Sequence, residues 1–298
     1  MMTAHPPVGV IGLGLLGSVL AARLIGAGLP VAGFDIDSRR RAILKNQGGE
    51  VAASAAQVMA RCQIIVVAVF NAAEVELLFD EFGRKPHLAG TVLICTTTCS
   101  PEDILRIAAR AADAGLGFVE APISGTSAET RDGSALALIA GEVAAIEAVQ
   151  PVLNVICPQQ MRLGEIGNAA RTKLALNLIL QNNRAALAEG LAFAESMGLD
   201  AAAFLATARR SAAYSRVMDS KGEKMLARDF APQSHIAQTL KDSELILEEA
   251  RQQEQHLPMT LIQTGLLRSA ITLVGPEADS SAVIEAIRPS KAKPRGRR

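Results

Sequence analysis

Residues 8–37 read VGVIGLGLLGSVLAARLIGAGLPVAGFDID, the segment with the clearest structural pattern in the chain. It opens with an apolar run typical of a buried strand, and an Ala/Leu-rich segment typical of a helix continues to about Ala27. Between the two lies Gly12-x-Gly14-x-x-Gly17, and a second strand is predicted to end at Phe34 and Asp35. The sequence therefore predicts a strand, a tight glycine turn, a helix and a second strand in succession.

Dinucleotide binding requires this order of elements. Gly12 permits the tight turn, Gly14 lets a pyrophosphate approach the backbone, and Gly17 lets the helix pack closely on the strand. The phosphates then sit on N–H groups at the positive end of the helix. A glycine turn alone is weak evidence, but an acidic residue also ends the second strand at the expected distance. We therefore predict a dinucleotide site that includes the residues between the glycines, Leu13, Leu15 and Leu16.

Asp35 indicates which dinucleotide binds. Its carboxylate can accept hydrogen bonds from the adenosine ribose, and its charge would repel the 2′-phosphate of NADP, so we expect NAD. NADP stays open as the alternative, because Arg39, Arg40 and Arg41 follow one turn later. Any of them could reach a phosphate, and all of them could equally be solvated helix charges.

The bulk composition narrows the class of protein. The 298 residues suffice for two domains with full cores, and the formal net charge is zero. Removing the six basic residues of the last eleven leaves about −6 on the body, so a folded nucleic-acid-binding face is not expected. The tail RPSKAKPRGRR has the composition of a disordered end. Its basic residues are Arg288, Lys291, Lys293, Arg295, Arg297 and Arg298.

The cysteines and the termini point to a cytoplasmic protein. The four cysteines have neither CxxC spacing nor a nearby histidine, so we expect buried, reduced thiols and no metal. They are Cys62, Cys95, Cys99 and Cys157. The start MMTAHPP has no basic n-region, and no apolar run approaches membrane-spanning length, so we expect neither secretion nor membrane insertion.

Helix and strand signals alternate after the opening motif. Ser38 is predicted to cap a helix through about Asn46, and Ser54 to start another. The run of residues 64–69 is apolar at every position, which suits a parallel strand covered on both faces. Asn71 follows at the edge where doubly wound sheets bind ligands. It is therefore a candidate for the cofactor edge, and an Asx turn or helix cap is the alternative.

Further strands are predicted at residues 90–95, 118–120, 135–140 and 152–156. A hydroxyl-rich loop, residues 96–101, follows the first of these, and it could touch a ligand or simply cap the next helix. Residues 121–126 are predicted to leave the second strand as a loop. The alternation with helices predicts a mostly parallel sheet with a mixed edge.

The composition changes beyond Gly164. From about Asn168 to Met197, Ala, Leu and Ile recur at helical spacing, and the rest of the chain is helical too. A helix of about 30 residues would span about 45 Å, so we read it as a connector. We predict an α/β Rossmann domain over residues 1–164, an all-helical domain over 165–287 and a disordered basic tail over 288–298.

Lys173 and Asn177 are the candidate catalytic pair, because they lie one turn apart on this helix. A lysine in an apolar helical pattern is either a snorkelling surface residue or a buried functional one. The helix leaves the nucleotide-binding domain just before Lys173, which would direct the ammonium at a cleft between domains. Burial there would lower its pKa toward a value useful for proton transfer.

Four motifs together resemble the β-hydroxyacid dehydrogenase family, whose members include 3-hydroxyisobutyrate dehydrogenase, tartronate semialdehyde reductase and glyoxylate/succinic semialdehyde reductases. GLGLLGSVLAARLIGAG is similar to the family's cofactor signature, and EAPISGT to its substrate loop DAPVSGG. GNAARTKLALN resembles the catalytic-helix motif GxGxxxKxxxN, and KDSELIL resembles KDLxLA. The resemblance covers almost the whole chain up to the tail.

The resemblance implies a role for each matching position. Lys173 would be the general acid/base, and Asn177 would hold the substrate beside it. Ser124 and Gly125 would bind the substrate carboxylate. The remaining positions would lie near the nicotinamide: Thr98, Lys241 and Asp242.

The chain departs from the family pattern at four positions. Glu120 replaces an aspartate, and Ala169 replaces a glycine of the catalytic-helix motif. Thr126 replaces a glycine of the substrate loop, so it would add a hydroxyl and a methyl beside the carboxylate site. Ser234 stands where members acting on small semialdehydes often have phenylalanine, so it would leave room for a larger or more hydroxylated substrate.

We therefore predict an NAD(P)-dependent oxidoreductase that transfers a hydride between nicotinamide and a small β-hydroxy acid or semialdehyde. The Ala-rich connector helix makes a homodimer or homotetramer the expected assembly. An imine reductase of the same architecture is the first alternative, and the lysine argues against it. A non-catalytic nucleotide-binding protein is the second, although a scaffold would need none of Ser124, Lys173, Asn177 and Asp242.

Overall fold

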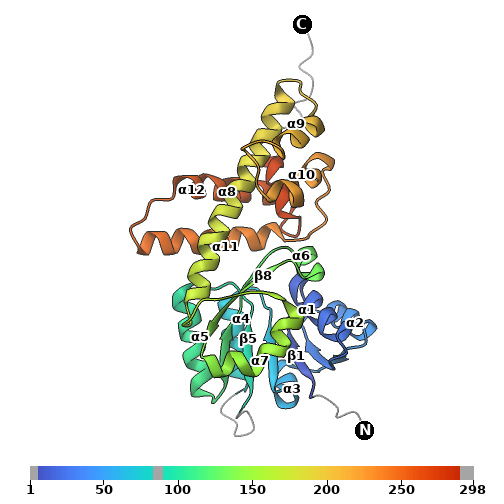
Figure 1. The fold of residues 1–298 in the computed structure, drawn as a ribbon, viewed down its shortest axis with the longest axis vertical. Helices are drawn as coiled ribbons and strands as arrows, with labels where there is room; N and C mark the ends of the chain where they lie inside the picture. The colour runs from blue at the N-terminus through green and yellow to red at the C-terminus, as the bar shows by residue number, and fades with distance from the viewer. Residues whose placement is uncertain (1–5, 83–89, 289–298) are drawn as a thin grey trace. The chain divides into compact units, whose positions relative to one another are not determined.

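The computed structural model describes residues 6–82 and 90–288, which form two compact units (Figure 1). Unit 1 is Met1–Leu174 and unit 2 is Ala175–Arg298. The division falls inside helix α8 (Asn168–Ser196), a single helix of 29 residues. The boundary at residue 164 that composition suggested stays a prediction.

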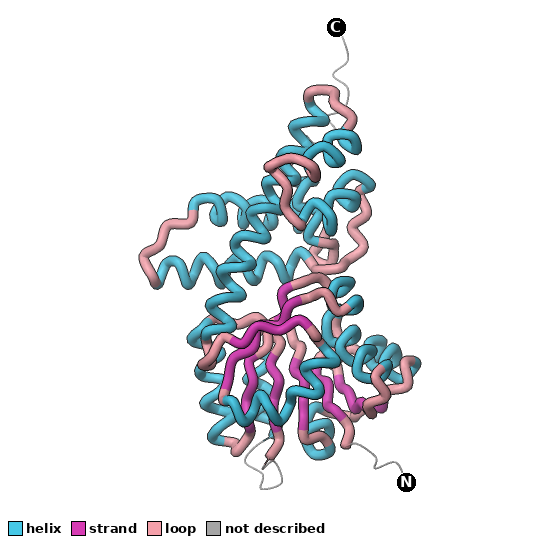
Figure 2. The backbone as a smooth tube through the Cα atoms, viewed as in Figure 1, coloured by secondary structure: helices cyan, strands magenta, loops and turns pink. Residues whose placement is uncertain are grey.

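Unit 1 is built on one twisted sheet (Figure 2). The strand order is β3-β2-β1-β4-β5-β6-β8-β7, and β9 pairs with β8. All pairs from β3 across to β6 are parallel, whereas β8 runs antiparallel to β6 and β7. The predicted parallel sheet with a mixed edge is confirmed. The strands are β1 (Val8–Ile11), β2 (Val31–Phe34), β3 (Glu50–Val51), β4 (Ile64–Val67), β5 (Val92–Cys95), β6 (Gly117–Glu120), β7 (Ile123–Ser124), β8 (Leu136–Gly141) and β9 (Gln159–Arg162).

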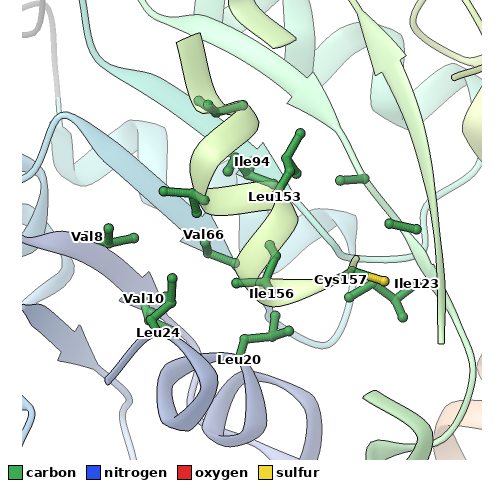
Figure 3. Close-up of a cluster of buried hydrophobic side chains, with 14 of the residues drawn as sticks. Val8, Val10, Leu20, Leu24, Val66, Ile94, Ile123, Leu153, Ile156 and Cys157 are labelled. Atoms are coloured by element: carbon green, nitrogen blue, oxygen red, sulfur yellow. The ribbon is translucent and has the colours of Figure 1, made fainter. Parts of the chain in front are cut away.

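Helices cover both faces of this sheet, and each face has its own apolar core. On one face, Leu20 of α1 and Leu153 of α7 converge on strand residues such as Val10 (Figure 3). The other face packs against α3, α4 and α5. Burial on both faces explains why the central strands are apolar at every position. The helices of unit 1 before α8 are α1 (Leu15–Gly26), α2 (Ser38–Asn46), α3 (Ala55–Arg61), α4 (Ala72–Phe82), α5 (Pro101–Asp113), α6 (Ser127–Asp132) and α7 (Val143–Ile156).

Side-chain caps start several of these helices. Ser54 and Ser100 accept N–H groups at the starts of α3 and α5, and the predicted cap at Ser54 is confirmed. The predicted cap of α2 was wrong by one residue, because Asp37 accepts the N–H of Arg39 and Ser38 is already helical. A carboxylate and a hydroxyl both cap helices well, so the sequence alone did not show which of Asp37 and Ser38 is the cap.

Two predicted segments were wrong. Residues 152–156 belong to helix α7 and not to a strand, because Val149, Leu153 and Ile156 continue a buried helical face. A run of five residues is too short to show the spacing of apolar residues that marks a helix. Within the loop predicted over residues 121–126, Ile123 and Ser124 form strand β7, which pairs with β8.

Unit 2 is helical throughout its described part. Its core joins α8 to the other helices, and it includes Leu191, Leu205, Met225 and Leu267. The elements are α9 (Ala201–Ala208), α10 (Val217–Ala227), α11 (Ile236–Gln252), α12 (Pro258–Val274) and the 3-10 helix η2 (Ser280–Ala286). Across residues 6–82 and 90–288, no helix combines the length and the apolar character that a membrane span needs. The predicted Rossmann sheet, long helix and helical second part are confirmed.

Candidate active site

The glycine turn lies between β1 and α1 as predicted. Gly12 has φ +89°, in the region that favours glycine. A Cβ on Gly17 would lie 1.9 Å from the Gly12 carbonyl oxygen, so no other residue fits this contact. Around Gly14 the space is open, since a Cβ there would meet only the Arg40 guanidinium at 3.8 Å.

The start of α1 fits a dinucleotide phosphate. No side chain caps this helix at Gly14, and its first turn contains no acidic residue. The N–H groups at its N-terminus therefore face the open space beside Gly14 without a competing carboxylate. By contrast, α2, α3, α5 and α6 all have side-chain caps.

Asp35 is buried just beyond β2, where it holds the glycine turn in place. Its carboxylate accepts the N–H of Leu13 at 2.7 Å and that of Asp37 at 2.8 Å. Arg40 Nη1 lies 3.3 Å from Asp35 Oδ2. The acidic group is thus next to the turn, as the cofactor prediction requires.

The three consecutive arginines have different surroundings. Arg39 pairs with Asp37, and Arg41 donates to the carbonyl oxygens of Asp35 and Ile36. The pKa of the Asp37 carboxyl falls to about 2 because Arg39 donates side-chain and backbone hydrogen bonds to it. Only Arg40, of the three, lies beside both Asp35 and Gly14.

The loops after β4 and β5 lie at the same edge of the sheet. Asn71 Oδ1 accepts the N–H of Glu74 at 2.9 Å, so the cap interpretation of Asn71 is confirmed. Its contact with a cofactor stays a prediction. Thr96 and Thr97 donate their hydroxyl hydrogens to the carbonyl oxygens of Val67 and Val69, which fixes the loop that carries the buried Thr98.

Lys173 is buried, with 6% of its surface exposed, so the snorkelling alternative was wrong. Its Nζ donates to the Ile123 carbonyl oxygen at 2.7 Å. Ile123 directly precedes Ser124, the residue to which the resemblance assigns the substrate carboxylate. The structure therefore brings the lysine and the predicted substrate loop together.

Glu120 anchors the same segment to the start of α8. Its Oε2 accepts the N–H of Gly167 at 2.8 Å, whereas its Oε1 has no hydrogen-bond partner among the described residues, and the N–H groups of Ala169 and Ala170 lie nearby. Burial raises the pKa of Glu120, and these N–H groups oppose the rise. Residues 120–123 thus contact α8 at two points. Glu120 contacts the start of the helix, and the Ile123 carbonyl oxygen contacts Lys173.

The rest of the predicted substrate loop forms a turn. Gly125 is exposed with φ +153°, and a Cβ there would lie 2.8 Å from that of Ala135. Thr126 caps α6, accepting the N–H of Glu129 while the Glu129 carboxylate accepts the N–H of Thr126. The hydroxyl that distinguishes this loop from the family pattern is therefore used within the loop.

In unit 2, Asn177 and Asp242 are direct partners. The buried Asn177 donates from Nδ2 to Asp242 Oδ2 at 2.9 Å. Lys241 Nζ lies 2.8 Å from Asp242 Oδ1. Asp242 thus links Asn177, which is predicted to hold the substrate, to Lys241.

Ser234 belongs to a buried ionic network. Its hydroxyl lies 3.3 Å from Lys221 Nζ and 2.8 Å from the Ser280 hydroxyl. Lys221 pairs with Asp279 at 2.8 Å, and both side chains are at most 2% exposed. Burial lowers the pKa of Lys221 to about 8, although the Asp279 carboxylate opposes this.

Sequence reasoning missed Glu120 as an anchor, and also Lys221, Asp279 and the buried Arg184. The signal for Glu120 was an acidic residue ending an otherwise apolar strand. The other three had none, because their contacts join segments far apart in the chain.

Among the described residues, no group of three or more histidine, cysteine, aspartate or glutamate side chains could hold a metal ion. All four cysteines are buried free thiols, as predicted.

Two family models match the chain. Residues 7–164 match the model of the NAD binding domain of 6-phosphogluconate dehydrogenase. Residues 167–287 match that of the NAD-binding domain of NADP-dependent 3-hydroxyisobutyrate dehydrogenase.

Individual relatives cover nearly the whole chain. The 2-(hydroxymethyl)glutarate dehydrogenase of Eubacterium barkeri is 31% identical over 93% of this chain and 93% of its own length. The 2-hydroxy-3-oxopropionate reductase of Escherichia coli is 29% identical over 94% and 96%. The crystal structure of 3-hydroxyisobutyrate dehydrogenase from Salmonella typhimurium superposes with TM-score 0.86 at 26% identity, covering 94% of this chain and 99% of that one. The chain therefore belongs to the β-hydroxyacid dehydrogenases, the family of NAD(P)-dependent oxidoreductases that act on hydroxy acids and semialdehydes.

Proposed function

We propose that this enzyme transfers a hydride between NAD and a small β-hydroxy acid or its semialdehyde, with Lys173 as general acid/base. The observation that carries the proposal is the buried Lys173 ammonium, hydrogen-bonded to the carbonyl oxygen directly before Ser124. A buried, positioned lysine can transfer a proton and stabilise negative charge on a reacting oxygen.

A bound nicotinamide ring would accept the hydride in the oxidative direction and donate it in the reductive direction. In the oxidative direction the neutral amine form of Lys173 takes the hydroxyl proton of the substrate, and in the reductive direction the ammonium form gives a proton to the carbonyl oxygen. Ser124 and Gly125 bind the substrate carboxylate, and Thr98 and Lys241 lie at the nicotinamide. Because a carboxylate only accepts hydrogen bonds, Asp242 fixes Asn177 with its amide nitrogen toward Asp242. The Asn177 carbonyl oxygen is then the group available to a substrate hydroxyl.

The proposed coenzyme preference rests on Asp35. Its buried carboxylate beside the glycine turn would repel a 2′-phosphate, and all three nearby arginines already have partners, Arg40 with Asp35 itself. We expect NAD to bind several-fold more tightly than NADP. Asp35→Ser should reverse this order, and Arg40→Ala should weaken NADP binding in that variant. Fluorescence titration with both coenzymes measures each affinity, and tighter binding of NADP by the wild type would contradict the proposal.

The proposed assembly is a homodimer or homotetramer formed through unit 2. The support is a set of exposed apolar side chains on α8 and α12, which a second copy would cover. They include Ile179, Phe193, Met259, Leu261 and Ile262. Light scattering on Ile262→Asp beside the wild type tests this, and a monomeric wild type would contradict it.

The function is tested with purified enzyme, both coenzymes and a panel of substrates taken from the relatives. The panel holds 2-(hydroxymethyl)glutarate, 3-hydroxyisobutyrate and 2-hydroxy-3-oxopropionate. We expect reduction of NAD or oxidation of NADH with at least one member. Absence of hydride transfer with the whole panel would contradict the proposed substrate class.

A further inference from the structure

Arg184 is a buried cation of helix α8 whose Nε donor is not used by the described part of the protein. Only 5% of its surface is exposed, and within the described chain its Nε has no hydrogen-bond partner. Burial lowers its pKa to about 10, and the carboxylates of Asp242 and Asp279 oppose that shift. The guanidinium is therefore still charged at neutral pH.

The two neighbouring carboxylates already have cationic partners. Asp279 pairs with Lys221 at 2.8 Å, and Asp242 pairs with Lys241 at 2.8 Å. Arg184 therefore adds a positive charge for which the described part of unit 2 provides no further buried carboxylate. A buried charge is unfavourable unless an opposite charge accompanies it, so this arrangement calls for an anion.

The position of Arg184 relates it to the substrate-holding residue. It follows Asn177 by seven residues on α8, which is about two turns and about 10 Å along the helix. Asp242 connects them, because it bonds to Asn177 and acts electrostatically on Arg184. Ser281, two residues after Asp279, likewise has a buried hydroxyl without a partner among the described residues.

We propose that Arg184 binds a second carboxylate of the substrate, so that the enzyme selects β-hydroxy acids with an acidic side chain. This rests on the proposed function, because it describes the far end of the same substrate. A guanidinium presents planar paired donors that match a carboxylate. A lysine here would offer only a point charge.

Two members of the substrate panel form a matched pair for the test. 3-Hydroxyisobutyrate carries a methyl group where 2-(hydroxymethyl)glutarate carries a carboxyethyl group. The 5-amide of 2-(hydroxymethyl)glutarate is an isostere that keeps the first carboxylate but has no charge at the far end. We expect kcat/KM for the diacid to exceed that for either monocarboxylate by about tenfold or more. Arg184→Met should abolish this preference while kcat/KM for 3-hydroxyisobutyrate changes less than about threefold, and Arg184→Lys should retain part of it.

Binding provides a second readout. Glutarate should inhibit the wild-type holoenzyme about tenfold more strongly than butyrate, and Arg184→Met should remove the difference. Arg268→Met is the matched control, because Arg268 is an exposed arginine of unit 2 paired with Glu244. An equal wild-type response to diacid and monoacid would overturn the proposal without any variant. If the panel is inactive but glutarate still binds through Arg184, the proposed function fails and the anion site stands.

Discussion

Two buried lysines, one in each unit, have different kinds of partner. Lys173 in unit 1 donates to the carbonyl oxygen of Ile123. Lys221 in unit 2 contacts both oxygens of Asp279, at 2.9 and 2.8 Å. Both side chains are nearly inaccessible, with 6% and 2% of their surfaces exposed. Burial of a lysine therefore does not by itself distinguish catalysis from structure.

The surroundings of each partner make the distinction. Ile123 belongs to the segment that continues into Ser124, so Lys173 is fixed beside a proposed substrate-binding group. Asp279 accepts N–H groups of Gln233, Ser234 and Ser281 as well as Lys221. That carboxylate joins α10, the chain before α11 and η2, so Lys221 holds unit 2 together. We infer that Lys173 acts on substrate and that the Lys221 pair acts on stability.

The largest expected effect is on turnover by Lys173→Met. Removal of a general acid/base lowers kcat by about 1,000-fold. The free energy of unfolding should change much less, because methionine fills a similar volume and removes a buried charge. Steady-state kinetics and denaturant unfolding of one preparation measure both. A variant that lost stability but kept turnover would reverse the roles assigned to the two lysines.

The next effect is on stability. Asp279→Asn should lower the free energy of unfolding by about 3–5 kcal/mol, because it leaves the Lys221 ammonium buried without its carboxylate. Asp229→Asn is the control, since Asp229 is 55% exposed in its pair with Lys224 and little change is expected.

The same pair predicts a dependence on pH. The burial of Asp279 would raise its pKa, but Lys221 and the backbone N–H groups outweigh this, so the pKa lies below the ordinary 3.8. The stabilisation is therefore present above pH 3.8 and is lost as the pH falls through the lower value of the folded protein. Urea unfolding of wild type and Asp279→Asn should show a difference at pH 7 that shrinks in strong acid. A difference independent of pH would argue against the ion pair.

A smaller effect is expected from Glu120, a positioning residue for Lys173. Glu120→Gln removes the negative charge at the N-terminus of α8, and we expect kcat to fall about tenfold with KM for coenzyme unchanged. Glu120→Asp should retain most of the activity. Because the pKa of Glu120 is raised above 4.5, wild-type kcat should fall as the pH drops through that raised value. This acid limb should be absent in Glu120→Gln, and its persistence there would refute the positioning role.

Local patterns were predicted correctly from the sequence. The glycine turn depends on residues close together in the chain, and so do the acidic end of β2 and the long helix. The cap formed by Asn71 is also a local contact, because Asn71 accepts the N–H of Glu74, three residues later in the chain. The exceptions are the cap of α2, which was wrong by one residue, and residues 152–156, where a short apolar run did not reveal its helical period.

Contacts between distant segments could not be predicted. Glu120 meets Gly167 across 47 residues, and Lys221 meets Asp279 across 58. No local spacing encodes either contact. Arg184 gave no signal in the sequence, because whether its helix face is buried depends on helices that come later in the chain. The role of Lys173 came from resemblance, and the structure added its burial and its partner.

The most direct test of the account is chemical rescue of Lys173→Ala. The substitution removes the amine and leaves space for a small one, so added ethylamine should restore turnover in proportion to its concentration. Tetramethylammonium is the control, because it carries the same charge but no transferable proton. We predict rescue by ethylamine alone, with coenzyme binding unchanged throughout. Equal rescue by both compounds, or near-normal turnover without either, would contradict proton transfer by Lys173.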